Sequence, residues 1–273
     1  MNEWVEIRIS GATDRQAVIN ALFQCGSQGV EEAGADIVTH LPSGSPENEI
    51  RDAIRAADAG SLVQIRAARS IDFSGWRADV KAHRLGSLTV APPWLGGESD
   101  PASTIVIDPA MAFGTGEHAT TRGVIRLMQR VITPESTVAD LGAGSTVLSI
   151  AAAKLGARRV VAIELDHDAA GNALENIRVN DVASRVHFVE GDAFTILPLI
   201  GPVSVVFANI LSSVLVELLP GIHDSLVTGG QAILSGILFA EREMMLGEIG
   251  RGGWRVDAED SEDEWWSVLI SRS

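Results

Sequence analysis

The sequence has a single cysteine, Cys25, among its 273 residues. One thiol can form neither an intramolecular disulfide bond nor a cysteine metal cluster. The cysteine content therefore fits a protein of a reducing cytoplasm, and we expect no metal site.

The sequence also lacks a long uninterrupted hydrophobic run. The most apolar segment, residues 203–219, is broken by polar residues at Ser204, Asn209, Ser212, Ser213 and Glu217. This predicts a buried strand followed by a helix and not a membrane span. The first residues, MNEWVEIRIS, have no basic start followed by an apolar run, so we expect no signal peptide and a cytoplasmic location.

Basic residues are scarce. The chain has 21 Lys and Arg residues against 36 Asp and Glu residues, which gives a net charge of −15. This charge opposes binding to the phosphate backbone of a nucleic acid and would steer a basic partner toward the protein. Six of the eight residues from Asp257 to Glu264 are acidic, and this run predicts a solvated loop.

The first part of the chain has the pattern of a small α+β domain. Apolar periodicity and turn residues predict strands at 3–10, 29–33, 35–41 and 62–67 and helices at 14–25 and 46–59. The order β-α-β-β-α-β is that of a split-βαβ, or ferredoxin-like, domain. We assign residues 1–66 to this domain and the more polar residues 67–83 to a linker.

The rest of the chain, residues 84–273, predicts an α/β domain. A helix with one apolar face covers residues 124–132, and from about residue 136 strands and helices alternate. Such alternation implies a mostly parallel sheet with helices on both faces. We therefore expect a Rossmann-like, doubly wound sheet in this part.

Three consecutive strands of this domain end in residues that suit a nucleoside. Gly142 and Gly144 follow the first strand, Glu164 ends the second, and Asp192 follows the third. Glycines allow a ligand to approach the backbone closely, and an acid one strand further on suits ribose hydroxyls. The pattern predicts a cofactor that carries adenosine.

Two common cofactor classes are disfavoured. A dinucleotide fingerprint G-x-G-x-x-G would need glycine at position 147, where the chain has Val147, and no G-x-x-x-x-G-K-[ST] motif occurs. A Rossmann oxidoreductase therefore remains a weaker alternative. An RNA-binding module is another, since split-βαβ domains can bind RNA through surface aromatic residues, but the acidic charge argues against it.

The segment VADLGAGSTVLSIAAAKLGARRVVAIELD resembles motif I and the second strand of class I S-adenosylmethionine-dependent methyltransferases. The segments IDPAMAFGTGEHATT, ANIL and LSGIL together resemble one family of that class. This is the PrmA type, which methylates a large-subunit ribosomal protein, number eleven of its series. The resemblance extends over nearly the whole chain, including the ending EDEWWSVLI.

The resemblance implies S-adenosylmethionine as the cofactor and assigns roles to individual residues. The cofactor-binding residues would be Thr121, Gly142, Gly144, Glu164, Asp192 and Asn209. Glu164 would bind the ribose and Asp192 would face the adenine amine. The loop 113–121 would cover the methionine end.

The resemblance also implies the acceptor chemistry. The methyl groups would go to lysine side chains and the N-terminal amine of the basic ribosomal protein, which the first domain would recognise. Asn209, His118 and Phe113 would stand at the catalytic end, where Asn209 would orient the incoming amine. A related alternative is a lysine methyltransferase for another protein, such as an electron-transfer flavoprotein subunit.

Thr146 departs from the family pattern, which has glycine at this position. A β-branched side chain there would crowd the methionine end of the cofactor or stiffen the turn. We favour crowding, so we expect Thr146→Gly to tighten cofactor binding.

Overall fold

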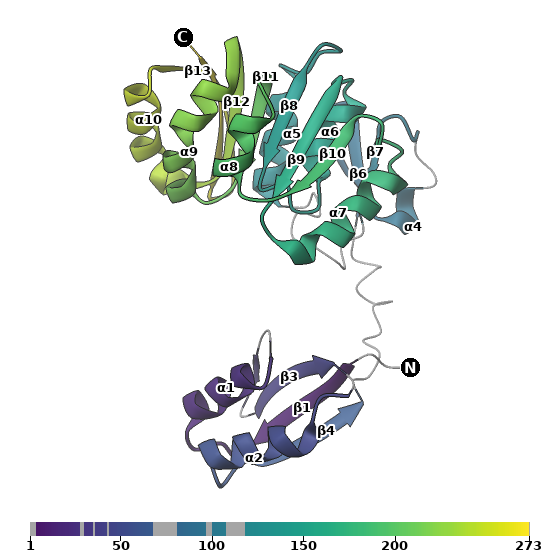
Figure 1. Cartoon of the computed structure of the whole chain (residues 1–273), viewed down its shortest axis with the longest axis vertical. Helices are drawn as coiled ribbons and strands as arrows, with labels where there is room; N and C mark the ends of the chain where they lie inside the picture. Colours follow the sequence, from purple (N-terminus) through teal and green to yellow (C-terminus); the bar gives the residue numbers. More distant parts are fainter. Residues whose placement is uncertain are drawn as a thin grey trace. The chain divides into compact units, whose positions relative to one another are not determined.

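The computed structural model describes residues 4–27, 30–34, 36–42, 44–67, 81–96, 100–107 and 118–272. The chain divides into two compact units, residues 1–79 and 80–273 (Figure 1). Most of the predicted linker, residues 67–83, lies outside the described residues, so its role stays a prediction.

The first unit has the element order that the sequence predicts. Its elements are β1 (Trp4–Ser10), α1 (Arg15–Gln24), β2 (Glu31–Ala33), β3 (Asp36–Pro42), α2 (Glu47–Ala57) and β4 (Leu62–Ala67). The four strands form an antiparallel sheet in the order β2-β3-β1-β4. Buried side chains of the sheet and both helices, among them Ile7, Leu22 and Ile54, form a core that belongs to this unit alone.

The second unit is built on a seven-stranded sheet in the order β10-β9-β8-β11-β12-β14-β13. Its strands are β8 (Thr137–Leu141), β9 (Arg159–Glu164), β10 (Val186–Glu190), β11 (Val203–Asn209), β12 (Leu226–Leu238), β13 (Trp254–Glu262) and β14 (Trp265–Arg272). The strands from β10 to β12 are parallel, while β14 pairs antiparallel with both β12 and β13.

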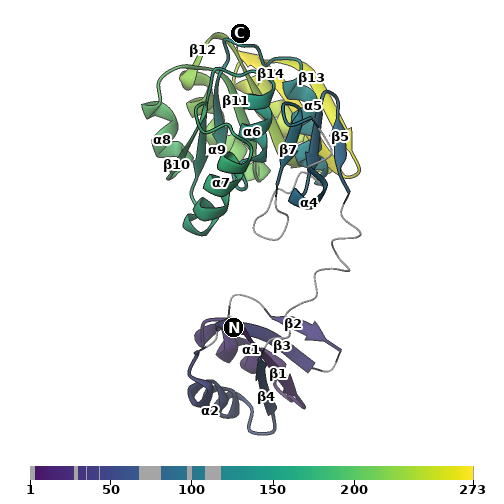
Figure 2. The same ribbon diagram turned by 90° about the vertical axis from the view of Figure 1, so that its right-hand side faces the viewer.

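Helices cover both faces of this sheet (Figure 2). The helices are α5 (Ala119–Met128), α6 (Val147–Lys154), α7 (His167–Val179), α8 (Ala193–Ile196), α9 (Ser212–Ser225) and α10 (Arg242–Arg251), with short 3₁₀ turns η1 (Leu197–Leu199) and η2 (Phe239–Glu241). Successive residues of β11 point to opposite layers. Val205 and Phe207 pack with α5 and α6, whereas Val206 and Ala208 pack with α9. The predicted doubly wound sheet is confirmed.

A small sheet that the sequence patterns did not predict packs on the same side of the large sheet as α5 and α6. It consists of β5 (His83–Leu85), β6 (Leu88–Ala91) and β7 (Thr104–Val106), with the short helix α4 (Pro93–Gly96) between its last two strands. Its residues Leu85, Val90 and Ile105 are buried in the same core cluster as α5.

The acidic run from Asp257 to Glu264 is not the solvated loop that the sequence predicts, because most of it forms β13. Arginines of α5 neutralise its side chains: Arg126 Nε lies 2.8 Å from Asp260 Oδ2 and Arg122 Nε lies 2.9 Å from Glu262 Oε1. The composition of the run shows its charges but not these partners, which lie on a helix more than a hundred residues earlier in the sequence.

The neighbouring strands β8 and β11 mark the point where the order of the sheet reverses. In open α/β sheets, ligands bind beyond the carboxyl ends of the strands at such a switch point. The described residues contain no helix long and apolar enough to cross a membrane.

Candidate functional site

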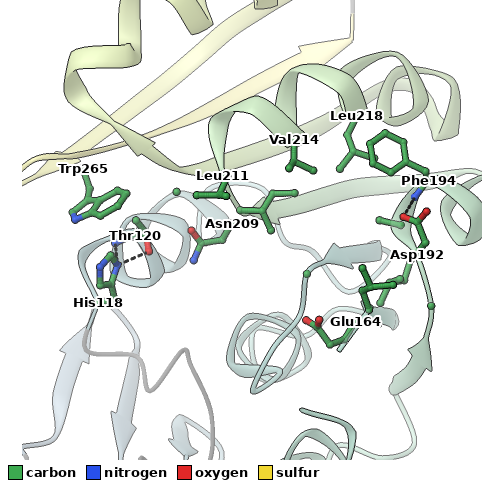
Figure 3. Close-up of a pocket in the computed structure, with 17 residues that line it drawn as sticks. His118, Thr120, Glu164, Asp192, Phe194, Asn209, Leu211, Val214, Leu218 and Trp265 are labelled. Carbon is green, nitrogen blue, oxygen red and sulfur yellow. Dashed lines mark hydrogen bonds between the residues drawn. The ribbon is translucent and has the colours of Figure 1, made fainter. Parts of the chain in front are cut away.

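A cavity of about 480 Å³ lies at the carboxyl ends of β8, β9, β10 and β11, at the switch point of the sheet (Figure 3). Its volume is within the usual range for small-molecule and cofactor sites. Figure 3 shows Glu164 and Asp192 toward one end, Trp265 and His118 at the other, and Asn209 between them. The cavity therefore brings together five of the predicted site residues, namely His118, Gly142, Glu164, Asp192 and Asn209.

The turn after β8 requires glycine at Gly142. This residue has a φ of +69°, and a Cβ placed on it would come within 2.5 Å of the Ile210 side chain. The N–H groups of Gly142 and Ala143 donate to the carbonyl of Ile163, at 2.9 and 3.0 Å. These bonds join the end of β8 to the end of β9, and the missing side chain leaves Gly142 as an open floor of the cavity.

Glu164 is fixed by two backbone donors. Its Oε2 accepts from Gly144 N–H at 2.8 Å and its Oε1 accepts from Asp166 N–H at 2.9 Å. Each carboxylate oxygen keeps further acceptor capacity, and the side chain lines the cavity. Gly144, which the sequence predicts as a cofactor contact, is not among the lining residues and acts here through Glu164.

Asp140 stands behind this turn and was not singled out as a site residue from the sequence. Burial raises the pKa of its carboxyl to about 6, a hydrogen bond from Ser149 opposes the rise, and the charge of Glu164 adds to it. Ser149 Oγ donates to Oδ2 at 2.6 Å. Oδ1 is buried and makes no hydrogen bond within the described part of the chain. A buried acceptor with no partner is costly. Asp140 is not among the residues that line the cavity, so its carboxyl would act on a ligand there through its charge.

Asp192 and Phe194 line the cavity beyond β10. Asp192 caps α8, where its Oδ1 accepts from Phe194 N–H at 3.0 Å. Both side chains are exposed to solvent. Asp192 therefore stands where the sequence predicts an adenine contact, next to an aromatic ring that the sequence analysis did not identify.

Asn209 and Ile210 leave the end of β11 toward the cavity. Ile210 N–H donates to Ser235 O at 3.2 Å. Gly236, with a φ of +80°, has no room for a Cβ, which would come within 2.4 Å of Ile210 O. Gly142 in the turn after β8 and Gly236 of β12 thus lie directly against Ile210 and hold the backbone next to Asn209.

The start of α5 forms the other end of the cavity. His118 caps this helix: its Nδ1 lies 3.4 Å from Thr120 N and 2.8 Å from Thr120 Oγ1. Its ring packs edge-to-face against Trp265, with the centroids 4.9 Å apart. Thr120 lines the cavity, whereas Thr121, the predicted cofactor contact, is buried and is not a lining residue. Phe113, predicted at the catalytic end, lies outside the described residues.

Thr146 does not crowd the cavity as we favoured from the sequence. It has left-handed backbone geometry, with a φ of 64°, at the start of α6, and its side chain is fully buried. Its hydroxyl donates to Ser145 O at 2.6 Å and lies 3.4 Å from Ala173 O of α7. The side chain therefore packs under α7, and the residue is not among those that line the cavity.

Sequence reasoning missed the apolar part of the cavity wall. The missed residues are Leu165, Phe194, Leu211, Val214, Leu218 and Trp265. Leu165 directly follows Glu164, and Phe194 and Leu211 lie two residues after Asp192 and Asn209. This adjacency is the signal that could have found these three residues.

Comparison with known proteins agrees with this architecture. Residues 49–273 match the model of a family described as Ribosomal protein L11 methyltransferase (PrmA). A protein of that name from Desulfitobacterium hafniense is 30% identical over 308 residues, which cover 98% of this chain and 97% of that protein. Another from Pelobacter propionicus is 40% identical over 221 residues, 77% of this chain and 69% of that protein.

A solved structure shares the fold as well. The crystal structure of the ribosomal protein L11 methylase from Lactobacillus delbrueckii subsp. bulgaricus matches with a TM-score of 0.63 and 29% identity, over 71% of this chain and 99% of that chain. Sequence and structure thus agree over most of the molecule, and the chain belongs to the PrmA family.

Proposed function

We propose that the protein transfers methyl groups from S-adenosylmethionine to lysine side-chain amines and the N-terminal amine of ribosomal protein L11. The observation that carries this proposal is the cavity at the switch point, which has the carboxylates of Glu164 and Asp192 toward one end, His118 and Trp265 at the other, and Asn209 between them (Figure 3). Family membership supports the same reaction.

The residues of the cavity fit a cofactor that carries adenosine and positive charge. The fixed carboxylate of Glu164 can accept hydrogen bonds from two ribose hydroxyls, and the floor at Gly142 has no side chain to block them. Asp192 and Phe194 offer an acceptor and an aromatic face for an adenine base. The carboxylate of Glu164 would also place negative charge in the cavity, which suits a cationic cofactor. The buried carboxyl of Asp140, whose Oδ1 has no partner among the described residues, stands behind the Gly142 turn and would add to this charge when ionised.

S-adenosylmethionine, when bound, supplies a methyl group on a sulfonium that needs no further activation. The chain then has to align an uncharged amine with that methyl group and keep water away. Asn209 lines the cavity next to Ile210, which lies against Gly142 and Gly236, and its carboxamide would orient the amine. Trp265 and His118 form the wall on the acceptor side.

The acceptor lysine must lose a proton, because its reference pKa is about 10.4. Apolar surroundings lower the pKa of an amine by disfavouring the charged form. The wall contributed by Leu211, Val214 and Trp265 supplies such surroundings. We therefore assign no general base, and we give His118 a structural role, because it caps α5 through Nδ1 and packs against Trp265.

The choice of ribosomal protein L11 as substrate rests on the names of the relatives and on charge complementarity. A chain with a net charge of −15 attracts a basic protein at long range. None of the described residues of the first unit lines the cavity, so this unit is free of cofactor contacts there, and we assign it a part in recognising the substrate.

Mass spectrometry of L11 after incubation with this protein and S-adenosylmethionine tests the proposal. We expect mass increases in steps of one methylene, located by peptide mapping on lysines and the N-terminus. L11 that has been exhaustively acetylated on its amines is the control and should gain nothing. No mass increase in unmodified L11, with the cofactor shown to bind, would refute the choice of substrate.

A further inference from the structure

Three chain segments meet beside the acceptor end of the cavity and form one rim. Ile210, before Leu211, donates to Ser235 O at 3.2 Å, which ties the end of β11 to β12. Leu238 of β12 pairs with Trp265 of β14. Phe239 N–H then donates to Glu264 O at 2.7 Å, which closes the turn between β13 and β14 onto the end of β12.

The rim exposes large apolar side chains. Leu211 is 71% exposed, Phe239 is 53% exposed and Leu238 is 40% exposed. Leu211 also lines the cavity, on the same wall as Trp265 (Figure 3). Apolar surface that continues out of a binding cavity marks an interaction site more strongly than a single exposed leucine does.

The charges of the rim are acidic and free. Asp263 and Glu264 are both exposed, and no cation pairs with either carboxylate within residues 118–272. The acids just before them are paired, since Glu262 binds Arg122 and Arg126 while Asp260 binds Arg126. Asp263 has a φ of 53°, a backbone conformation that Asp and Asn tolerate better than most residues.

We propose that this rim, formed by Leu211, Leu238, Phe239, Asp263 and Glu264, docks the segment of the protein substrate that flanks the target amine. The proposal rests on the function proposed above and adds where the substrate chain lies on the catalytic unit. The occupant is a segment with both aliphatic and basic side chains. Its aliphatic groups cover Leu211 and Phe239, while its basic groups approach Asp263 and Glu264.

The chemistry of the rim favours this occupant over a nucleic acid or a second copy of the chain. Free carboxylates repel phosphates, and the excess negative charge of this protein opposes self-association at an acidic surface. Lysine suits such a surface, because its apolar stem packs on leucine and phenylalanine while its ammonium group stays near a carboxylate.

Calorimetric binding of L11 to the full-length protein, with methyl transfer measured in parallel, tests the rim. The double variant D263N/E264Q should raise the Kd for L11 about three- to tenfold at low salt, and the effect should shrink at high salt. F239S should weaken binding at both salt concentrations. Neither change should alter the Kd for S-adenosylmethionine.

Matched control variants lie elsewhere in the same unit. D181N/E135Q makes the same change of charge, and Asp181 has a left-handed φ of 55° like that of Asp263. Both control residues are exposed. Glu135 precedes β8 and Asp181 precedes β10, so both lie at the amino ends of the parallel strands, opposite the cavity. L199S removes an exposed leucine outside the rim. All three substitutions should leave the Kd for L11 within about twofold of the wild type.

The outcomes separate the rim from the proposed function. If the rim variants bind L11 more weakly and the control variants do not, the rim is supported. This holds even if the wild type transfers no methyl group, because the absence of transfer would refute only the proposed function. Normal transfer with L11 binding unchanged by the rim variants overturns the rim and keeps the function. No binding of L11 to the wild type, or self-association of the wild type that F239S abolishes, also overturns the rim.

Discussion

The amide of Gly144 donates a 2.8 Å hydrogen bond to the carboxylate of Glu164. This contact joins the glycine turn after β8 to the end of β9 across the floor of the cavity. One side chain therefore does two things: it holds the shape of the turn, and it presents its remaining acceptor sites to a ligand.

Replacing Glu164 with Ala should weaken S-adenosylmethionine binding by roughly ten- to a hundredfold, because hydrogen bonds to a charged group contribute about 1.5–3 kcal/mol. Glu190→Ala is the matched control. Glu190 pairs with Glu164 in the register of β10 and β9 but is not a lining residue. Isothermal titration of both variants tests the difference, and equal affinity in the two would exclude Glu164 from the cofactor site.

Sequence periodicity predicted the four strands of the first unit to within a few residues, and the alternation of strands and helices in the second. It also predicted the strand ends where Gly142, Glu164, Asp192 and Asn209 line one cavity, because parallel strands bring their carboxyl ends to one edge. Such predictions succeed where a local pattern is enough. The alternation in β1 and the apolar runs of β9 and β11 each reflect the burial of that segment alone.

The remaining features depend on partners distant in the chain. The acidic residues of β13 predict a loop, because the sequence shows the charges but not their partners. Arg122 and Arg126, which neutralise two of these residues, lie on a helix more than a hundred residues earlier. The direction of the Thr146 side chain depends on its positive φ. No periodic pattern in the sequence records such a backbone angle.

Substituting Thr146 with Gly should leave cofactor affinity within about twofold of the wild type, since the side chain packs under α7. Release of the left-handed strain should stabilise the fold by about 1–2 kcal/mol. The loss of a buried methyl and the greater freedom of glycine should offset this by about 1–2 kcal/mol. We therefore expect little change in Tm by thermal unfolding. Tighter binding in calorimetry would restore the crowding hypothesis.

Asp140 should make both stability and cofactor binding depend on pH. Its pKa is raised from 3.8 to about 6 by burial, so the folded state holds a proton that the unfolded state has released. The stabilising contribution is complete below about pH 4 and is lost as the pH rises through about 6, with a magnitude of roughly 2–3 kcal/mol. Asp140→Asn should remove this slope in urea unfolding while keeping an acceptor for Ser149.

Binding should show the opposite trend with pH. A cationic cofactor prefers the carboxylate, so S-adenosylmethionine should bind more tightly as the pH rises through about 6. The D140N variant should bind more weakly at neutral pH and lack this midpoint. A wild-type Kd that stays constant between about pH 5 and about pH 7 would show that Asp140 does not sense the ligand.

Removing the first unit should separate cofactor binding from substrate capture. The second unit, residues 80–273, has its own core and contains the whole described cavity. A protein made of this unit alone should bind S-adenosylmethionine with nearly unchanged affinity in calorimetry. Its methylation of L11 should fall strongly, because the positioning of the amine provides much of the rate.

Salt provides an independent check on the same hypothesis. If acidic surfaces capture the basic substrate, methylation by the full-length protein should slow as ionic strength rises, through a lower association rate. The rate at which the second unit alone methylates a short lysine peptide should depend less on ionic strength, because fewer charges of the peptide and the protein approach one another. If the truncated protein methylates intact L11 at the full-length rate, the first unit serves only as a stabilising appendage, and substrate capture belongs to the catalytic unit alone.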